Sequence, residues 1–247
     1  MQVYDEIGSG YAPVRRADPR IRQAITDGLG TASRVVNVGA GPGSYEPRDR
    51  RVVAVEPSWD MIRQRPAHAS PCIRAAAEAL PFPDDTFDAA LAVLTIHHWS
   101  NLRHGLREMR RVAPRRVVLF TWDPAYANAI WMNTHYLPEA AALDVRRFPT
   151  MEAITHALPG ARVDVVPIPH DCTDGFYGAY WRRPEAYLQP EVRAGISVLR
   201  MLPNDVVAAG LKRLADDLRS GAWHARLGAL LQRETLDLGY RLVVVGQ

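Results

Sequence analysis

Three glycines stand two residues apart at Gly39, Gly41 and Gly43, directly after a run of valines. Because glycine has no Cβ, the backbone can turn sharply there and approach a ligand closely. A second apolar run, residues 52–55, ends at Glu56, whose carboxylate can accept two hydrogen bonds from a vicinal ribose diol. The pattern predicts two strands buried on both faces, with a nucleotide-type cofactor bound at their ends.

The glycine spacing separates two classes of cofactor site. Dinucleotide-binding enzymes need a third glycine three residues after the second, near a helix start that faces a pyrophosphate. Here the third glycine comes after two residues, and position 44 is Ser44. A nicotinamide-dependent oxidoreductase is therefore disfavoured, and a glycine turn that binds no ligand is the plainer alternative.

The G-x-G-x-G pattern followed by an acid resembles motif I and its sequel in class I S-adenosylmethionine-dependent methyltransferases. Residues 77–88, AEALPFPDDTFD, closely resemble the A-E-x-L-P-F-x-D-x-S/T-F-D signature of the type 11 methyltransferases, which include quinone-biosynthesis enzymes. Together with residues 39–43 and 55–58, this makes three blocks in the family's order. By these three blocks the chain resembles the type 11 family of class I methyltransferases.

The resemblance implies S-adenosylmethionine as cofactor, S-adenosylhomocysteine as product, and a set of binding residues. Glu56 holds the ribose, Ala77 and Glu78 border the adenine, and the glycine loop leaves room for the methionyl part. The cofactor-binding residues expected on this basis are Tyr11, Arg15, Gly39, Ala40, Gly41, Glu56, Pro57, Ala77, Glu78 and Leu94. Packing at a strand end for Ala77 and a solvated helix cap for Glu78 are the alternatives without a ligand.

The N-terminal segment contains Tyr4, Tyr11, Arg15 and Arg16 and resembles the family's lead-in, in which an aromatic residue closes over the methionyl end. By the same resemblance an arginine pairs with the methionyl carboxylate, and the guanidinium fork suits a carboxylate bidentately. Arg15 is favoured by its spacing from Tyr11. The alternative is an arginine at a solvated helix start.

Two positions depart from the family pattern. Asn37 stands where the family commonly has Asp or Glu, so it can form hydrogen bonds but contributes no charge toward the cofactor's ammonium or sulfonium group. The helix that normally follows motif I is also expected to be short. Pro47 and the run at residues 48–51 leave room for about two turns of ~3.6 residues each.

His97 and His98 follow the fourth predicted strand, at the edge of the sheet where ligands bind in open α/β folds. A neutral imidazole there can take a proton from a hydroxyl, an amine or an activated carbon as it attacks the methyl group. Alternatively, the two histidines only shape the pocket. The segment lacks the Asn/Asp-Pro-Pro-Tyr/Phe element of enzymes that methylate exocyclic base nitrogens, so a nucleic acid substrate is disfavoured.

Strands are expected near residues 34–38, 52–56, 72–76, 88–94, 115–121, 162–166 and 241–245, with helices near 19–29, 58–65 and 101–113. This alternation predicts an α/β fold with a doubly wound, seven-stranded, mostly parallel sheet, the Rossmann-like methyltransferase fold, with the last strand antiparallel at the edge. We expect one domain over residues 1–247, with a core of about 19–122, 162–168 and 241–245. Insertions at about 124–160 and 170–238 are expected to form a helical lid.

The composition narrows the partners and the compartment. The net charge is +3, but Lys212 is the only lysine, so the basic residues are almost all arginine. This composition indicates a GC-rich coding bias and weakens any inference of nucleic-acid binding. No apolar run reaches the ~20 residues of a membrane helix, and the N-terminus lacks a signal-peptide pattern, which predicts a cytoplasmic protein without membrane contact. Cys72 and Cys172 share no metal-ligand spacing, so neither a disulfide nor a metal site is expected.

The aromatic residues of the lid, including the dense run at 170–181, suit either a small-molecule pocket or simple packing on the sheet. The function expected is in-line transfer of a methyl group from S-adenosylmethionine to a small, partly apolar molecule, by a monomer or homodimer. The alternative is a protein of the same fold that catalyses cyclisation, isomerisation or elimination, with S-adenosylmethionine bound structurally.

Overall fold

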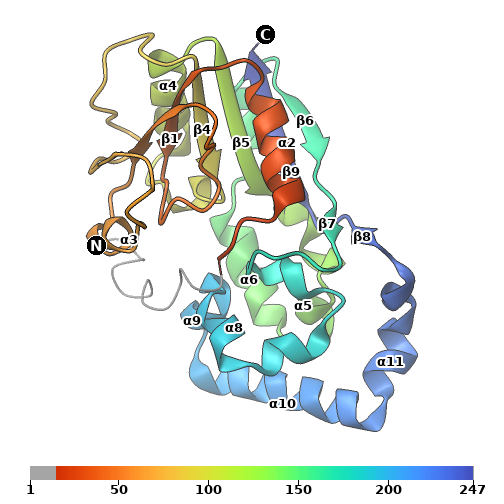
Figure 1. Ribbon diagram of the computed structural model, residues 1–247. Coiled ribbons are helices and arrows are strands. Elements are labelled where there is room, and N and C mark those ends of the chain that lie inside the picture. The colour runs from red at the N-terminus through yellow and green to blue at the C-terminus, as the bar shows by residue number, and fades with distance from the viewer. Residues whose placement is uncertain (1–14, 247) are drawn as a thin grey trace.

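A seven-stranded sheet forms the centre of the upper half of the molecule in Figure 1. The structure is a computed structural model, and it describes residues 15–246. The strands are β1 (Arg34–Val38), β2 (Arg51–Val55), β3 (Cys72–Ile73), β4 (Ala89–Val93), β5 (Arg116–Trp122), β6 (Arg162–Val165) and β9 (Tyr240–Gly246), in the order β3-β2-β1-β4-β5-β9-β6. Strands β1 to β5 are parallel, which confirms the predicted doubly wound, mostly parallel sheet.

Strand β9 is antiparallel to both of its neighbours, β5 and β6. The prediction that the last strand lies at the edge is wrong, because β9 is inserted between β5 and β6 and β6 forms the edge. Residues 240–245 of β9 are all buried, as an interior strand requires, whereas β6 leaves Val163 and Val165 exposed.

Helices cover both faces of the sheet. Helix α2 (Pro19–Leu29) contacts β5 and β9, and Asp18 caps it by accepting a hydrogen bond from the Arg20 backbone N–H. Helix α4 (Leu102–Val112) contacts β4 and β5 and is capped by Asn101. Side chains alternate along β5, so Val118 joins the hydrophobic cluster that includes α2 and Val117 the one that includes α4.

No helix forms between β1 and β2, so the short helix expected after the glycine pattern is absent. The three glycines have φ values of +68° at Gly39, +52° at Gly41 and +89° at Gly43. An α-helix requires φ near about −63°, so alternate residues in this segment lie outside the helical region. Turns therefore connect β1 to β2. The short helix α3 (Trp59–Arg63) follows β2.

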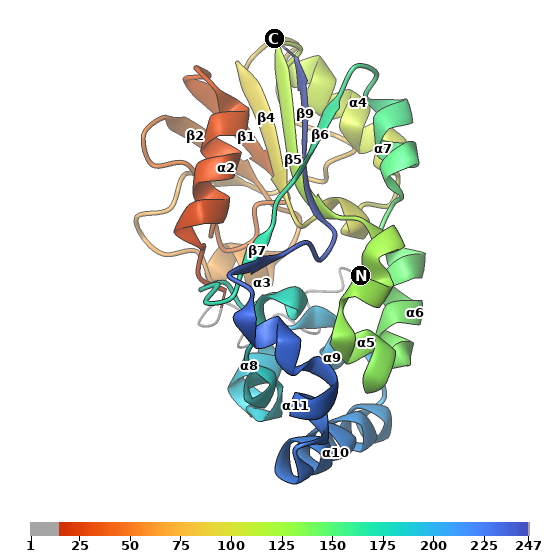
Figure 2. The same ribbon diagram turned by 90° about the vertical axis from the view of Figure 1, so that its right-hand side faces the viewer.

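Most of the remaining helices lie beyond the carboxyl ends of the parallel strands, in the lower half of Figures 1 and 2. Between β5 and β6 come η2 (Pro124–Ala129), α5 (Trp131–His135), α6 (Pro138–Arg147) and α7 (Met151–Ala157). Helix α7 is the exception, because it lies beside α4 and joins the hydrophobic cluster on that face of the sheet, so the predicted insertion at 124–160 does not lie wholly over the strand ends. Between β6 and β9 come β7 (Ile168–Pro169), η3 (Tyr177–Tyr180), η4 (Pro184–Leu188), α8 (Pro190–Ala194), α9 (Ser197–Met201), α10 (Asn204–Ser220), α11 (Ala222–Leu227), η5 (Gly228–Gln232) and β8 (Thr235–Leu236). Strands β7 and β8, which were not predicted, pair as a separate two-stranded sheet.

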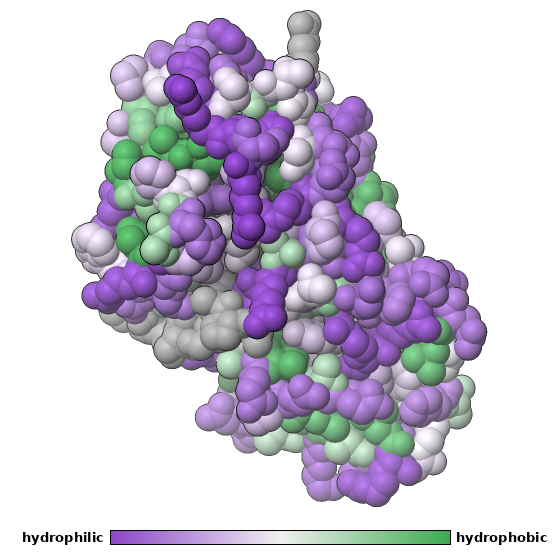
Figure 3. All heavy atoms as spheres, in the orientation of Figure 1, coloured by the Kyte–Doolittle hydropathy of each residue, from purple (hydrophilic) through white to green (hydrophobic). Residues whose placement is uncertain are grey.

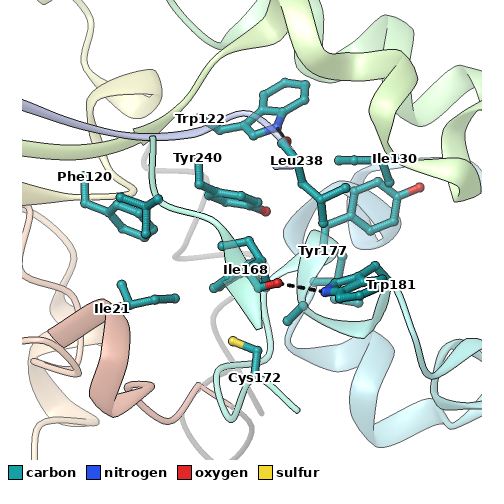
Figure 4. Close-up of a cluster of buried hydrophobic side chains, with 14 of the residues drawn as sticks. Ile21, Phe120, Trp122, Ile130, Ile168, Cys172, Tyr177, Trp181, Leu238 and Tyr240 are labelled. Atoms are coloured by element: carbon teal, nitrogen blue, oxygen red, sulfur yellow. Dashed lines mark hydrogen bonds between the residues drawn. The ribbon is translucent and has the colours of Figure 1, made fainter. Parts of the chain in front are cut away.

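Aromatic side chains join these helices to the sheet. The ring of Trp131 lies 5.4 Å from that of Tyr187 and 5.5 Å from that of Trp223, in edge-to-face geometry. Trp181 accepts a hydrogen bond at its carbonyl from Trp131 and donates its own indole N–H to the Ile168 carbonyl (Figure 4). One continuous hydrophobic cluster therefore runs from Phe120 on β5 into the lower helices.

Hydrophilic residues cover most of the face seen in Figure 3, and hydrophobic residues gather there only in small groups. Within residues 15–246, no helix has both the length and the hydrophobicity of a membrane-spanning segment.

Candidate active site

A cleft of about 920 Å³ opens at the carboxyl ends of β1, β2 and β4. It brings together most of the residues predicted to bind a cofactor. Those that line it are Arg15, Gly39, Ala40, Gly41, Glu56, Pro57, Ala77 and Leu94, and His98 lines it as well. Five segments, each 15 or more residues from the next in the sequence, therefore meet in one cavity.

Glu56 is buried, with 6% of its surface exposed, and both of its carboxylate oxygens accept backbone hydrogen bonds. Oε2 accepts from the Gly41 N–H at 2.8 Å and Oε1 from the Ser58 N–H at 2.9 Å. The carboxylate thus ties the glycine loop to the start of α3. A carboxylate oxygen can accept more than one hydrogen bond, so a ligand hydroxyl can bind beside a backbone N–H.

Gly39 and Gly41 differ in what surrounds them. A Cβ at Gly39 would lie 2.1 Å from Thr95 Oγ1, so only glycine lets the loop pass this close to the end of β4. A Cβ at Gly41 would meet no atom within 4 Å, although Gly41 is part of the cleft wall. The first glycine permits packing, and the second leaves open space.

Asn37 is buried at the end of β1 and belongs to a polar cluster that the sequence did not reveal. Its Nδ2 donates to Glu46 Oε1 at 3.4 Å, and Glu46 forms a buried ion pair of 2.6 Å with Arg65. Arg65 also donates to the Gly41 carbonyl at 2.9 Å. Asn37 is also part of the cleft wall, and no described residue hydrogen-bonds its Oδ1.

Arg15 is held by a carboxylate from the other half of the molecule. Its Nε lies 2.6 Å from Asp174 Oδ1, and its Nη2 donates to Asp174 Oδ2 at 3.2 Å. Tyr45 donates its hydroxyl to the same Oδ2 at 3.0 Å, and burial raises the pKa of this phenol. The run at residues 170–181 therefore supplies an acid that fixes the guanidinium at the cleft.

Of the two other predicted cofactor-binding residues, only Glu78 belongs to the described part of the chain. Glu78 does not line the cleft, because its carboxylate accepts hydrogen bonds from Ser100 Oγ at 2.9 Å and from the Asn101 N–H at 3.0 Å. Tyr11 lies outside the described residues.

Leu94 at the end of β4 has φ +48°, which is uncommon for a residue with a side chain. Its N–H donates to the Phe120 carbonyl at 2.7 Å, which holds this conformation in place. Strain of this kind costs about 1–3 kcal/mol and often marks a functional position. Leu94 lines the cleft and also a second cavity.

The second cavity, of about 540 Å³, lies between the strand ends and the lower helices. Aromatic and aliphatic side chains make up most of its wall, and Figure 4 shows several of them grouped together: Trp122, Ile130, Tyr177 and Tyr240. The wall is completed by Arg15, Leu94, His97, Asp144, Phe148, Phe176, Gly195, Ile196, Ser197 and Val198. Arg15 and Leu94 belong to both cavities, so the two are neighbours.

His97 and His98 are divided between these cavities: His97 lines the second and His98 the cleft. The end of α6 holds both rings. Phe148 stacks on His97 with 3.8 Å between ring centroids, and Arg147 Nη2 lies 3.4 Å from His98 Nδ1. Because a guanidinium can only donate, His98 Nδ1 is the acceptor and Nε2 carries the proton.

Both histidines are neutral near pH 7. Burial, followed by the charge of Arg147, lowers the pKa of His98 to about 3. Burial, the neighbouring His98 and Arg147 lower the pKa of His97 well below its usual range. Protonated rings would be poorly solvated here and would lie close to a cation.

Asp144 is a further residue that the sequence did not single out. It lies on α6 with 8% of its surface exposed and lines the second cavity. Burial raises its pKa to about 6, although Arg147, 3.3 Å away, partly opposes the shift. Nothing in the spacing of α6 could have shown that this acid faces a cavity, since the other walls come from distant segments.

The comparisons with known proteins agree with this geometry. A family model described as a methyltransferase domain matches residues 36–120. A solved structure from Anabaena variabilis, assigned as a methyltransferase of an antibiotic biosynthesis pathway, is 33% identical with a TM-score of 0.89, over 95% of this chain and 99% of that one. This chain belongs to the class I S-adenosylmethionine-dependent methyltransferases. Its cofactor is S-adenosylmethionine, as predicted.

Two curated relatives of this methyltransferase have names that give different acceptors. A malonyl-[acyl-carrier protein] O-methyltransferase of Erwinia billingiae is 33% identical over 135 residues, which cover 50% of this chain and 52% of that protein. A tRNA (carboxymethyluridine(34)-5-O)-methyltransferase of Schizosaccharomyces pombe is 25% identical over 112 residues, 45% of this chain and 49% of the relative. The chain thus spans about half the length of these relatives, and the likeness does not identify an acceptor.

The cleft of this methyltransferase has the chemistry that its cofactor requires. Glu56 offers acceptors for ribose hydroxyls, and Asn37 Oδ1 offers one for an ammonium N–H. The open space at Gly41 allows a ligand to approach the backbone closely. Within the described residues, no group of three or more His, Cys, Asp or Glu side chains could hold a metal ion.

Proposed function

We propose that the protein transfers a methyl group from S-adenosylmethionine to a small, partly apolar acceptor that binds in the second cavity. The observation that carries this proposal is that Arg15 and Leu94 line both cavities, so ligands in the two would meet there. The cofactor supplies an activated methyl group: the acceptor atom bonds to the methyl carbon, the carbon–sulfur bond breaks, and sulfur keeps the electron pair.

In this proposal the cofactor is held by residues of the cleft. Glu56 binds the ribose hydroxyls, Ala77 borders the adenine, and Gly39 to Gly41 pass beside the methionyl part. Asn37 Oδ1 accepts from the methionyl ammonium, and Arg15 faces its carboxylate. These groups are ordered by backbone hydrogen bonds and ion pairs within the protein, which favours tight and oriented binding.

The wall of the second cavity supports a small acceptor. Trp122, Phe148, Phe176 and Tyr177 provide an apolar surface of the kind that encloses small molecules. We propose that the helices of residues 124–160 and 170–238 act as a lid over this cavity and exclude water from it. A nucleic acid would have to insert a single base past these helices.

The two histidines then contact the reacting groups in their neutral form. His98, fixed by Arg147, presents its Nε2–H, and His97 borders the acceptor. Orientation and removal of water are the main contributions expected of the protein, because the methyl group arrives already activated.

A glycine variant tests the cofactor site. Gly41→Arg should abolish binding of S-adenosylmethionine and S-adenosylhomocysteine in isothermal calorimetry, because the long side chain would enter the cleft. Gly160→Arg is a matched control: its φ is also positive, at +79°, and a Cβ there also meets no atom within 4 Å. Unchanged binding by folded Gly41→Arg would contradict the proposed site, and binding of NAD by the wild type would contradict the cofactor assignment.

A further inference from the structure

We propose that the acceptor carries a hydroxyl group, and that Asp144 binds this hydroxyl and takes its proton as the oxygen is methylated. This inference rests on the proposed function, because it assigns the second cavity to the acceptor. It goes further by naming the chemical class of the acceptor and the destination of the proton.

The surroundings of Asp144 give its carboxylate fewer partners within the protein than other buried acids have. Among the described residues its carboxylate receives one hydrogen bond, from Arg147 at 3.3 Å, near the limit for such a bond. The buried carboxylate of Asp174, by contrast, accepts from Arg15, Tyr45 and the Gly175 N–H. Asp144 therefore has room to accept a hydrogen bond from a ligand in the cavity that it lines.

The acidity of Asp144 suits a proton acceptor near neutral pH. Its pKa of about 6, raised by burial, makes it ionised at pH 7 yet more basic than an ordinary aspartate. Arg147 is the charged group beside it, and the cavity also contains Arg15, His97, Tyr177 and Tyr240. The elements packed against α6, namely η2, α5 and α9, carry Tyr126, His135 and Arg200 as their titratable or charged side chains.

The histidines are weaker proton acceptors than Asp144. A proton on His98 would sit on the ring that Arg147 already contacts, and the low pKa of His98, about 3, reflects burial and that cation. His97 is buried against Phe148, and burial, followed by His98 and Arg147, lowers its pKa well below its usual range, so it also holds a proton weakly. Both rings are thus better suited to packing and orientation than to taking a proton.

A hydroxyl group fits the polar groups of the cavity better than an ammonium or a carboxylate. Tyr240 lines the cavity, and its oxygen accepts from the Gly178 N–H at 3.3 Å, which leaves the phenolic proton available to donate. A hydroxyl can donate to Asp144 and accept from Tyr240, whereas an ammonium cannot accept and a carboxylate would be repelled by Asp144. In the step itself the acceptor O–H bond breaks, the proton goes to an Asp144 carboxylate oxygen, and the electron pair of that bond remains on the oxygen that is methylated.

Two isosteric probes test the assignment on protein saturated with S-adenosylhomocysteine. p-Cresol carries a hydroxyl, and p-fluorotoluene has a fluorine in its place. We expect p-cresol to bind at least fivefold more tightly at about pH 7.5 in an NMR titration, and this preference to shrink below about pH 6, where Asp144 becomes protonated. Asp144→Asn should remove the preference, and Glu139→Gln, an exposed acid on the same helix, should keep it.

A second pair of variants separates this inference from the proposed function. Ser197 is half-buried in the cavity wall, so Ser197→Trp should fill the cavity and weaken both probes, whereas Ser197→Ala should not. If both probes bind Ser197→Trp as tightly as the wild type, the second cavity is not the acceptor site. Probe binding that responds to Ser197→Trp but prefers p-cresol equally in Asp144→Asn would overturn only the role of Asp144.

A measurement on the wild type covers the case in which Asp144→Asn fails to fold. The carboxyl carbon of Asp144 can be titrated by NMR in protein labelled at aspartate. Binding of p-cresol should lower the midpoint of this titration, because the hydroxyl hydrogen-bonds the charged form, and p-fluorotoluene should not lower it. Equal midpoints with the two probes would overturn the inference.

Discussion

The two cavities each contain one buried carboxylate, and the protein treats the two groups differently. Glu56 in the cleft accepts two backbone N–H hydrogen bonds, at 2.8 and 2.9 Å. Asp144 in the second cavity accepts a single hydrogen bond of 3.3 Å, from the side chain of Arg147. The first arrangement orders a charged acceptor through the backbone, and the second leaves a carboxylate whose charge is less fully compensated. On the proposed assignment, backbone groups thus order the cofactor side, and side chains order the acceptor side.

Removal of the ordered carboxylate should have the largest effect. Glu56→Ala deletes two acceptors for the cofactor's ribose and leaves the Gly41 and Ser58 N–H groups without their partner. Affinity for S-adenosylhomocysteine should fall about 1,000-fold in calorimetry, or about 4 kcal/mol. Asp60→Asn, on the exposed part of α3, is the control, and a loss below about tenfold would show that Glu56 is not a main binding group.

The next largest effect is expected at Gly39, because the glycine loop packs closely against Thr95 at the end of β4. Gly39→Ala should reduce the free energy of unfolding by about 3 kcal/mol, since its Cβ would collide with Thr95 and φ is positive. Gly41→Ala has the positive φ but no collision, so its loss should be about 1 kcal/mol. Urea denaturation measures both, and equal losses would contradict the close approach of the loop to β4.

Substitution of Asp144 should change the free energy of unfolding in the opposite direction, toward greater stability. The pKa of Asp144, about 6, lies above its ordinary value of 3.8, so the folded state holds this proton more tightly than the unfolded state. Ionisation of this group therefore destabilises the folded state. The loss of stability develops as pH rises from about 4 to 6 and remains at higher pH. Asp144→Asn should be about 1–2 kcal/mol more stable than the wild type at about pH 8, and this gain should fade as pH falls toward 4.

Urea denaturation at about pH 8 and pH 4.5 checks this sign, with Glu139→Gln as the control on the same helix. If Asp144→Asn is less stable than the wild type at about pH 8, its neighbours stabilise the charge as they do for Glu56. The comparison between the two carboxylates would then fail.

The smallest expected effect is the absence of a titration. With a pKa of about 3, His98 should stay neutral from about pH 5 to 8, with the proton on Nε2. Imidazole nitrogen shifts in an NMR spectrum report both the charge and the tautomer. A His98 signal that titrates between pH 5 and 8 would return the histidine to the role of proton acceptor.

The cofactor side could largely be predicted from the sequence, because its signals are local. Valines mark the buried strands β1 and β2, Asp18 before Pro19 marks the start of α2, and the glycine spacing leads to Glu56. Each of these depends on neighbours within a few residues. The positive φ values of the three glycines are local as well, yet they also rule out the helix that the resemblance suggested there.

The acceptor side could not be predicted, because its residues meet only through tertiary contacts. Asp144 is one acid on an ordinary helix, and it faces a cavity only because β4, β5, η3, α9 and β9 supply the other walls. The position of β9 between β5 and β6 could not be predicted either, because a hydrophobic run does not by itself specify which strands it pairs with. The partners of Arg15 and Asn37, Asp174 and Glu46, are acids with no spacing rule that connects them.

The central claim is that the transferable methyl group lies where the two cavities meet, beside Leu94. S-adenosylmethionine labelled with carbon-13 at its methyl group can be bound to the protein, and its nuclear Overhauser contacts recorded. We predict contacts from this methyl group to the Leu94 methyl groups and to added p-cresol. Contacts confined to residues at the far end of the cleft, such as Met61 and Pro57, with none to Leu94, would contradict the account.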